Sequence, residues 1–212
     1  PKVYANRNGL WFSKWMSKPL ILFGKIFSPL SYLLTSSTSF IDKRLKEKKE
    51  VGTNELASYL KLKSSTVNEM LKRLKEKNLI NHEKYKKITL TPSGEQNGLK
   101  IVRKHRLWET FLFTKLDFDW IEIHEVAEQL EHIKSEKLVG KIDKLLGYPN
   151  FDPHGDPIPD KHGKIPQRIT KNLFAVDIGK NCIVLAVSDT SKDFLNYLED
   201  LGISIKTEIG LI

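Results

Sequence analysis

The stretch SSTVNEMLKRLKEKNLI, residues 64–80, decides the fold of this chain. Its apolar residues recur at the spacing of one helix face, and this stripe consists of Val67, Met70, Leu71 and Leu74. Ser64 or Ser65 is a candidate N-cap, and Asn78 is a candidate helix stop. We therefore expect an amphipathic helix whose apolar stripe belongs to a core, not to a surface that reads a ligand.

The neighbouring stretches complete a winged helix-turn-helix. TNELASYLKL, residues 53–62, predicts a short helix with Thr53 or Asn54 as its N-cap. LINHEKYKKITLTPSG, residues 79–94, alternates around a basic, aromatic turn, which predicts a two-stranded hairpin. Helix, turn, helix and basic hairpin are the parts of a DNA-binding fold.

Positive charge is concentrated in this same region. The 212 residues carry a formal net charge of +9. Residues 43–87 hold 14 Lys and Arg against 6 Asp and Glu, whereas residues 88–212 hold 16 against 19. A basic block on a compact domain is typical of a polyanion partner, because neutralised phosphates release condensed counterions. A solvated lysine-rich surface is the alternative.

Length and cysteine content set the broad class. The chain is long enough for one large domain or two small ones, and the change of pattern along it favours two. The single cysteine, Cys182, excludes an internal disulfide, and the sequence shows no signal-peptide pattern. We therefore expect a cytoplasmic protein.

An apolar segment precedes the basic block. Residues 19–35, PLILFGKIFSPLSYLLT, are interrupted by Lys25 and Pro29, so the uncharged run is shorter than the ~20 residues that span a bilayer. The pattern predicts an interfacial or incomplete membrane helix. A membrane contact through residues 19–35 is therefore an expectation.

Helices dominate the middle of the chain. We expect one from near Ser93 to about Leu116, one over HEVAEQLEH at residues 124–132, and one over residues 137–147. The next segment is rich in Pro, Gly and Asp and predicts a linker. After it, residues 173–189 predict two strands, residues 191–203 a short helix, and residues 208–212 an apolar strand.

HEVAEQLEH raises the question of a metal site. On one helix its four donors fall within an arc of about 100°, and these are His124, Glu128, Glu131 and His132. On the preceding helix, His105 and Glu109 form another pair one turn apart. Carboxylates and imidazoles without a thiolate suit Mn²⁺ or Fe²⁺. Solvated charges on an exposed helix face are the alternative.

Catalysis is not expected from these residues. A zinc-protease motif needs His at its first and fifth positions, and the fifth residue here is Glu128. Cys182 stands in an apolar strand-like run, and no serine lies in a nucleophile-elbow context. The sequence therefore predicts a protein that is not an enzyme.

From about residue 46 to residue 160, and more weakly to residue 212, the chain resembles the diphtheria-toxin-repressor and manganese-transport-regulator family of metal-dependent bacterial transcription factors. The motifs occur in order: STVNEMLKRLKEKNLI, HEKYKKITLTPSGE, RKHRLWETFL, HEVAEQLEH and DPHGDPIP. The resemblance implies a mainly α fold with four parts: a winged helix-turn-helix (46–98), metal-binding and dimerisation helices (99–150), a linker (151–170) and a partial, FeoA-like small β-barrel (171–212).

The resemblance also implies ligands and partners. The family's primary metal site corresponds to Glu128, Glu131 and His132, and its ancillary site corresponds to His105, Glu109 and His124. Iron-type members have Cys where this chain has Glu128, whereas manganese-type members have an acid, which favours Mn²⁺ over Fe²⁺. A homodimer and a double-stranded DNA operator are implied as well.

The helix over residues 64–78 is expected in the major groove. Side chains near its N-terminal end would meet base edges and phosphates, and these are Lys63, Ser64, Ser65, Thr66 and Asn68. Phosphate contacts are expected from Lys72, Arg73, Lys84, Lys86 and Lys87.

The N-terminal region departs from the family pattern. The family's first helix supplies a further primary-site ligand, but the matching positions here are near Ser37 and Phe40, which are poor ligands. Residues 1–45 are instead similar to the end of the membrane domain of hemolysin-like, CorC-type transport proteins, which suggests a misjoined segment. We therefore expect a weakened or absent metal response.

The sequence thus predicts a metal-dependent repressor, with Mn²⁺ or Fe²⁺ as the effector, that controls metal-ion homeostasis. Two alternatives stay open: a metal-independent winged-helix DNA-binding protein and a membrane-tethered fusion fragment.

Overall fold

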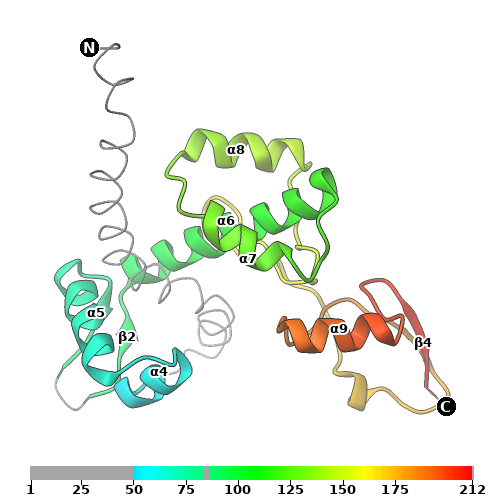
Figure 1. Ribbon diagram of the computed structural model, residues 1–212, viewed down its shortest axis with the longest axis horizontal. Helices are drawn as coiled ribbons and strands as arrows, with labels where there is room; N and C mark the ends of the chain where they lie inside the picture. Colours follow the sequence, from blue (N-terminus) through cyan, green and yellow to red (C-terminus); the bar gives the residue numbers. More distant parts are fainter. Residues whose placement is uncertain (1–49, 84–85, 212) are drawn as a thin grey trace, which may run out of the picture. The chain divides into compact units, whose positions relative to one another are not determined.

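The computed structural model describes residues 50–83 and 86–211 (Figure 1). Six α-helices and two small antiparallel sheets form the regular structure of these residues. The chain divides into two compact units, the first ending at Glu95 and the second beginning at Gln96. This confirms the mainly α fold class.

The first unit is the predicted winged helix-turn-helix. Helix α4, Thr53–Tyr59, is followed by α5, Ser64–Glu76, and then by the paired strands β1, Ile80–Asn81, and β2, Thr89–Leu90. The register places Ile80 opposite Leu90, and a bridge between Val51 and Ile88 extends the pairing. The hairpin tip at residues 84–85, which includes the predicted phosphate contact Lys84, lies outside the described residues.

The apolar stripe of α5 forms the centre of this unit's core, as its spacing predicts. The four stripe residues have between 0% and 6% of their surface exposed: Val67, Met70, Leu71 and Leu74. They cluster with Leu56, Ala57 and Leu60 from α4 and with Ile80 and Ile88 from the wing. Burial of this kind stabilises the fold by roughly 25 cal/mol per Å² of apolar surface removed from water.

The predicted helix starts were wrong by one residue. Gly52, not Thr53 or Asn54, is the N-cap of α4, and the Glu55 carboxylate accepts a hydrogen bond from its N–H. Lys63 is the N-cap of α5, so Ser64 is already helical. The expected stop is confirmed: α5 ends at Glu76, and Asn78 has a φ of 55°, a conformation that asparagine tolerates better than most residues.

Three helices build the second unit around one apolar cluster. Helix α6, Pro92–Leu116, starts in the first unit, and α7, Ile123–Leu130, and α8, Glu136–Leu145, follow. The centre of the cluster includes Leu107 and Leu112 from α6, Ile123 and Ala127 from α7, and Ile142 from α8. Its burial fixes the inner faces of α6 and α7, which carry the predicted ligands.

Helix α7 is shorter than the sequence suggests. It ends at Leu130, with Glu131 as the C-cap, so the helical arc drawn through His132 does not apply. The physical reason lies in the contacts of Glu131, because its carbonyl oxygen accepts a hydrogen bond from the Lys104 side chain. A carbonyl taken by a side chain in this way marks the last turn of a helix.

Residues 151–159, which the composition predicts to belong to a linker, are packed into the second unit. Asp152 and His154 have 7% and 1% of their surface exposed, and Ile158 has 2%. Backbone hydrogen bonds from Asp152 to Asp156 and from Ile158 to Asn150 close a tight loop. Pro and Gly exclude a helix here, but they do not prevent burial.

The C-terminal part contains one sheet and one helix. Strand β3, Asn181–Ile183, pairs antiparallel with β4, Glu208–Gly210, and α9, Lys192–Asp200, lies between them in sequence. The prediction of two strands in residues 173–189 was wrong, because a 3-10 turn, Leu173–Ala175, replaces the first. Leu195 and Leu198 of α9 join the apolar cluster of the second unit. The partial β-barrel stays a prediction.

No helix in the described residues is both long and apolar enough to cross a membrane. The apolar segment at residues 19–35, and with it the predicted membrane contact, lies outside the described residues.

Two helical glycines, Gly94 in the first unit and Gly140 in the second, allow a stability test. A Cβ on Gly94 would lie 1.8 Å from the Leu79 carbonyl oxygen, whereas a Cβ on Gly140 would meet nothing within 4 Å. We expect Gly94→Ala to lower the free energy of unfolding by about 1–3 kcal/mol. Gly140→Ala should raise it by roughly 0.5–1 kcal/mol, because alanine is the better helix former. Urea unfolding followed by circular dichroism measures both, and equal effects would contradict the close approach.

Candidate metal centre

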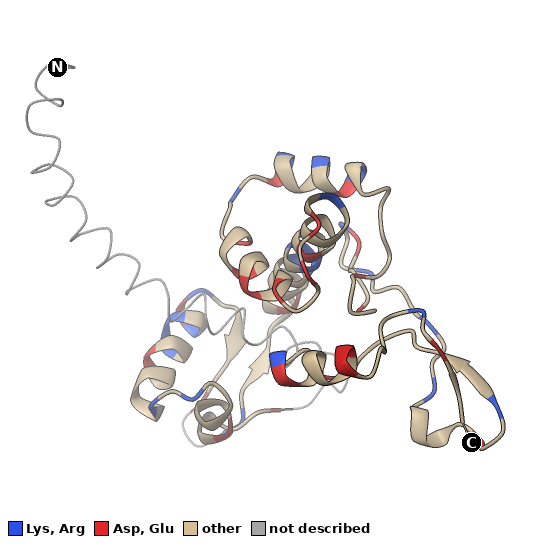
Figure 2. Ribbon diagram, turned by 45° about the vertical axis from the view of Figure 1, so that its right-hand side comes forward, with Lys and Arg blue, Asp and Glu red and all other residues tan. Residues whose placement is uncertain are grey.

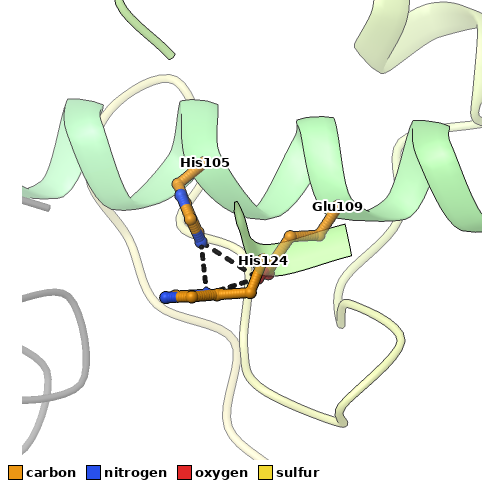
Figure 3. A group of neighbouring side chains, drawn as sticks. All are labelled: His105, Glu109 and His124. Carbon is orange, nitrogen blue, oxygen red and sulfur yellow. Dashed lines mark hydrogen bonds and ion pairs between the residues drawn. The ribbon is translucent and has the colours of Figure 1, made fainter. Parts of the chain in front are cut away.

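Two helices bring the predicted ancillary set together. His105 and Glu109 lie one turn apart on α6, and His124 lies in the first turn of α7 (Figure 3). His105 has 2% of its surface exposed and Glu109 has 3%, while His124 is half-buried. Among the described residues, these three make up the group of His, Cys, Asp and Glu side chains that is compact enough to hold a metal ion.

The three donor atoms form a nearly equilateral triangle. His105 Nε2 lies 2.9 Å from Glu109 Oε1 and 3.1 Å from His124 Nδ1. The third side, between His124 Nδ1 and Glu109 Oε1, is 3.0 Å. Hydrogen bonds to Glu109 Oε1 account for two sides of the triangle. In both bonds the histidine nitrogen carries the hydrogen and donates it to the oxygen, so neither nitrogen can accept a hydrogen bond from the other along the third side.

A divalent cation fits this donor set. A point about 2.1 Å from all three atoms, a typical length for a bond from a metal to imidazole or carboxylate, lies just above such a triangle. The donors are one carboxylate oxygen and two imidazole nitrogens, without a thiolate. Such a set suits Mn²⁺, Fe²⁺ or Zn²⁺, and the softness of the ligand atoms alone does not determine which of these metals binds.

Burial makes the ionisation of this cluster unusual. Desolvation by itself lowers the pKa of His105, but the charge and hydrogen bond of Glu109, together with those of Glu131, outweigh it and raise the pKa to about 10. Burial likewise raises the pKa of Glu109, yet the His105 charge and hydrogen bond hold that pKa well below its ordinary value. The metal-free cluster therefore contains an imidazolium held by carboxylates.

The residues implied for the primary site are arranged differently. Glu131 is 5% exposed, and its Oε2 accepts a hydrogen bond from His105 Nδ1 at 2.9 Å. Glu128 Oε1 lies 3.8 Å from His124 Nε2, and His132 is exposed. Each of the two glutamates thus contacts a histidine of the ancillary set. That Glu128, Glu131 and His132 hold one ion together stays a prediction.

His105 therefore links the two predicted ligand sets. Its Nδ1 faces Glu131 and its Nε2 faces Glu109 and His124. A carboxylate that accepts from one ring nitrogen fixes the tautomer and makes the other nitrogen a better ligand. In this arrangement Glu131 would orient His105 if a cation were bound at the triangle.

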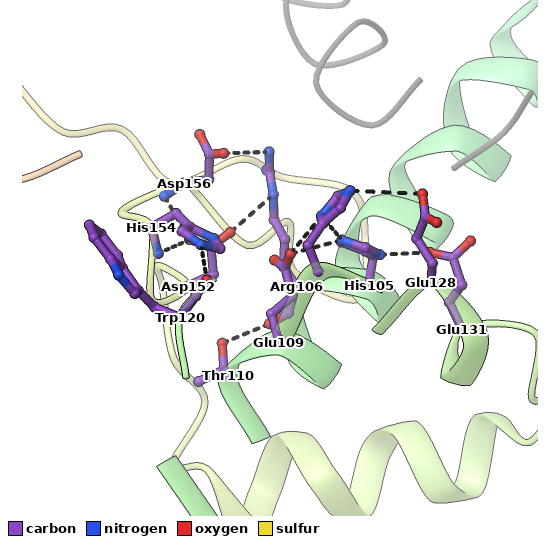
Figure 4. Close-up of polar contacts among 11 residues, drawn as sticks. His105, Arg106, Glu109, Thr110, Trp120, Glu128, Glu131, Asp152, His154 and Asp156 are labelled. Carbon is purple, nitrogen blue, oxygen red and sulfur yellow. Dashed lines mark hydrogen bonds and ion pairs between the residues drawn. The ribbon is translucent and has the colours of Figure 1, made fainter. Parts of the chain in front are cut away.

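A second buried network lies beside the triangle, and sequence reasoning missed it. Figure 4 shows Arg106 between Asp152 and Asp156, with His154 next to Trp120. Burial raises the pKa of Asp152 well above its ordinary value, and the Glu109 and Asp156 charges add to this effect, whereas the Arg106 charge and the Asp156 N–H act to lower it. DPHGDPIP was the available signal, but its Pro and Gly content pointed to a linker.

The predicted DNA-contacting residues are on the surface of the first unit, except for half-buried Thr66 and for Lys84, which is outside the described residues. Lys72 and Arg73 are exposed on α5, and in Figure 2 the ribbon is blue at Lys and Arg residues. In the wing, Lys86 lies 2.6 Å from Glu83, and Lys87 lies 4.0 Å from Glu50. Exposed pairs of this kind are weak. The phosphate contacts of both lysines stay a prediction.

The fold and the donor triangle together define a winged-helix protein with a metal-binding helical domain. Comparison with known proteins agrees. The model of the iron dependent repressor N-terminal DNA binding domain matches residues 43–88, and the model of the iron dependent repressor metal binding and dimerisation domain matches residues 91–160. The chain belongs to this iron-dependent repressor family, which confirms the resemblance seen in the sequence.

The solved structure and the first of two relatives described next are repressors, whereas the second relative is a membrane protein. A manganese-dependent transcriptional repressor in complex with manganese superposes with a TM-score of 0.71 at 36% identity, over 82% of this chain and 81% of that one. The iron-dependent repressor IdeR of Mycobacterium leprae is 31% identical over 104 residues, which are 49% of this chain and 45% of IdeR. A probable metal transport system membrane protein of Chlamydia trachomatis is 40% identical over 76 residues, 36% of this chain and 17% of that protein.

The raised pKa of His105 predicts how stability depends on pH. In chelator, the stabilisation from protonated His105 is complete below its unfolded pKa of 6.5 and is lost as pH rises through the folded pKa of about 10. Over that range the free energy of unfolding should fall, by at most about 1.4 kcal/mol per pH unit from this group. Urea unfolding at several pH values should show the fall in the unaltered protein and a smaller one in His105→Gln. Parallel curves for the two proteins would contradict the assignment.

Proposed function

We propose that this protein is a metal-dependent DNA-binding transcriptional repressor that controls metal-ion homeostasis. The effector is Mn²⁺ or Fe²⁺, and the partner is a double-stranded DNA operator. The role is binding, not catalysis, and a regulator of this kind works in the cytoplasm.

One observation carries the proposal: a triangle of two imidazoles and a buried carboxylate occurs in the same chain as a winged helix-turn-helix. Buried ionisable groups are costly unless a partner compensates them. Here His105, Glu109 and His124 are placed at the mutual distances that ligands of one cation adopt. The donor set, which has no thiolate among these three, is compatible with Mn²⁺ or Fe²⁺.

Metal acts as an effector through differential binding. A ligand shifts a conformational equilibrium only as far as its affinities for the two states differ. The chain holds the cation with α6 and α7, and α6 begins in the DNA-binding unit at Pro92. The cation thus favours the state in which the triangle is assembled, and we infer that this state is the one that binds DNA.

The homodimer is part of the same proposal. The second unit matches a domain described as metal-binding and dimerising. Two recognition helices related by a twofold axis read two half-sites, so the operator is expected to be an inverted repeat. Glu128 in place of a cysteine supports Mn²⁺ over Fe²⁺ as the physiological effector.

Removing the charge of Glu109 should abolish the metal response. For Glu109→Gln we expect Mn²⁺ to lose its effect on DNA affinity, because the buried carboxylate is the anionic corner of the triangle. The DNA duplex for this test would first be selected from a pool of random duplexes by the unaltered protein with Mn²⁺ present. The affinity of each protein for this duplex would then be measured by fluorescence anisotropy, once with Mn²⁺ and once with chelator.

Glu125→Gln is the matched control, since Glu125 is exposed on α7 near His124. It should keep the metal response. Equal DNA affinity of the unaltered protein with Mn²⁺ and with chelator would sink the metal-dependent reading and leave a metal-independent winged-helix protein.

The basic face of α5 should contribute through phosphate contacts. Lys72→Ala and Arg73→Ala are each expected to weaken binding to any duplex and to reduce the slope of log affinity against log salt by about 1. Lys144→Ala, at an exposed position on α8, is the control and should leave the slope unchanged. If the salt slope were the same in Lys72→Ala and Arg73→Ala as in the unaltered protein, DNA would not contact these two residues.

A further inference from the structure

We propose that Arg106 and the loop of residues 151–158 act as a splint that positions α7 against α6, so that His124 meets His105 and Glu109. Arg106, Asp152 and His154 are the positioning residues, and none of them is assigned a ligand role here. The proposal rests on the proposed metal role of the triangle, but its central readout needs no metal.

The first contact is between α6 and the loop. Arg106 follows His105 directly and has 3% of its surface exposed. One guanidinium nitrogen donates to the Pro157 carbonyl oxygen, Nε lies 3.4 Å from Asp152 Oδ2, and Nη2 lies 3.5 Å from Asp156 Oδ2 (Figure 4). A buried guanidinium must have its donors matched by fixed acceptors, so the loop can adopt few positions relative to α6.

The second contact is within the loop. Asp152 uses its two carboxylate oxygens differently, since Oδ2 faces Arg106 while Oδ1 accepts from the backbone N–H groups of His154 and Asp156, both at 2.9 Å. One side chain thereby transmits the position of the guanidinium to the backbone of His154. Its burial at 7% exposure keeps water from replacing these bonds.

The third contact reaches the start of α7. His154 has 1% of its surface exposed, and its Nε2 donates to the Trp120 carbonyl oxygen at 2.9 Å. The two rings also stack, with centroids 6.0 Å apart and an angle of 26°. Trp120 is three residues before Ile123, the first residue of α7, and four before His124. The splint therefore ends beside the residue that completes the triangle.

A neighbouring arginine provides the contrast. Arg103, one turn earlier on α6, donates to the Pro159 carbonyl oxygen and to Asp143 of α8, each at 2.6 Å. It joins α6 to the end of the loop and to α8, but it makes no contact with Asp152 or His154 in these bonds. Loss of Arg103 should cost stability without moving His124.

The test compares Arg106→Met, His154→Phe and Arg103→Met in the full chain. Histidine ¹⁵N NMR of the metal-free proteins reports whether His124 Nδ1 still bonds to Glu109. Mn²⁺ titration reports affinity at the triangle. His154→Phe keeps a stacked ring but loses the bond to Trp120, so it remains informative if Arg106→Met does not fold.

We expect Arg106→Met and His154→Phe to shift the His124 Nδ1 resonance towards that of a solvent-exposed imidazole and to weaken Mn²⁺ binding by about 10- to 100-fold. Arg103→Met should leave both readouts as in the unaltered protein, even where its unfolding midpoint falls. An unchanged His124 resonance in a folded His154→Phe variant would overturn the splint, as would an equal shift in Arg103→Met.

Failure of the proposed function gives a different result. If the unaltered protein binds no Mn²⁺, the metal role is lost, yet the His124 resonance in the metal-free variants still decides whether the splint positions α7.

Discussion

The structure of the second unit depends on one constraint: the ionisable side chains on the inner face of α6 are buried and must be matched. His105 has its two ring nitrogens paired with carboxylates, and Arg106 beside it has carboxylate and carbonyl partners. Breaking a buried ion pair by removing one partner costs about 3–5 kcal/mol, because a bare charge is left behind. The elements that supply the partners, α7 and the loop after α8, are therefore held in place by α6.

The same constraint bears on how a stable fold and the proposed cation site would coexist. Without metal, a proton on His105 compensates Glu109 and Glu131, as the pKa of about 10 shows. A divalent cation at the triangle would take over this compensation with more charge and with bonds to all three donors. Metal binding then releases protons, so affinity is expected to depend on pH as well as on ligand geometry. Glu131 Oε2 accepts a hydrogen bond from His105 Nδ1 and would keep this bond with a cation bound, which would leave Nε2 to act as the ligand.

Family membership and the donor triangle support each other, since each comes from different observations. The family models match residues 43–88 and 91–160, which cover both the DNA-binding domain and the metal-binding helices. The triangle is a property of this chain's own packing. Its three residues are the ancillary set that the resemblance implied. Of the implied primary set, Glu131 and Glu128 each contact a histidine of the triangle, and His132 is exposed. The primary site stays a prediction, and the positions near Ser37 and Phe40, where the sequence offers poor ligands, lie outside the described part.

The sequence by itself determined the helices, the wing and the core stripe, because apolar periodicity and turn residues are local signals. It also determined the pairing of His105 with Glu109, since residues one turn apart share a helix face. Only the tertiary structure decided that Glu131 bonds to His105, that α7 stops before His132, and that Asp152 and His154 are buried. These facts depend on contacts between residues far apart in the chain, such as Arg106 and Pro157, and the spacing of residues within one segment carries no information about them.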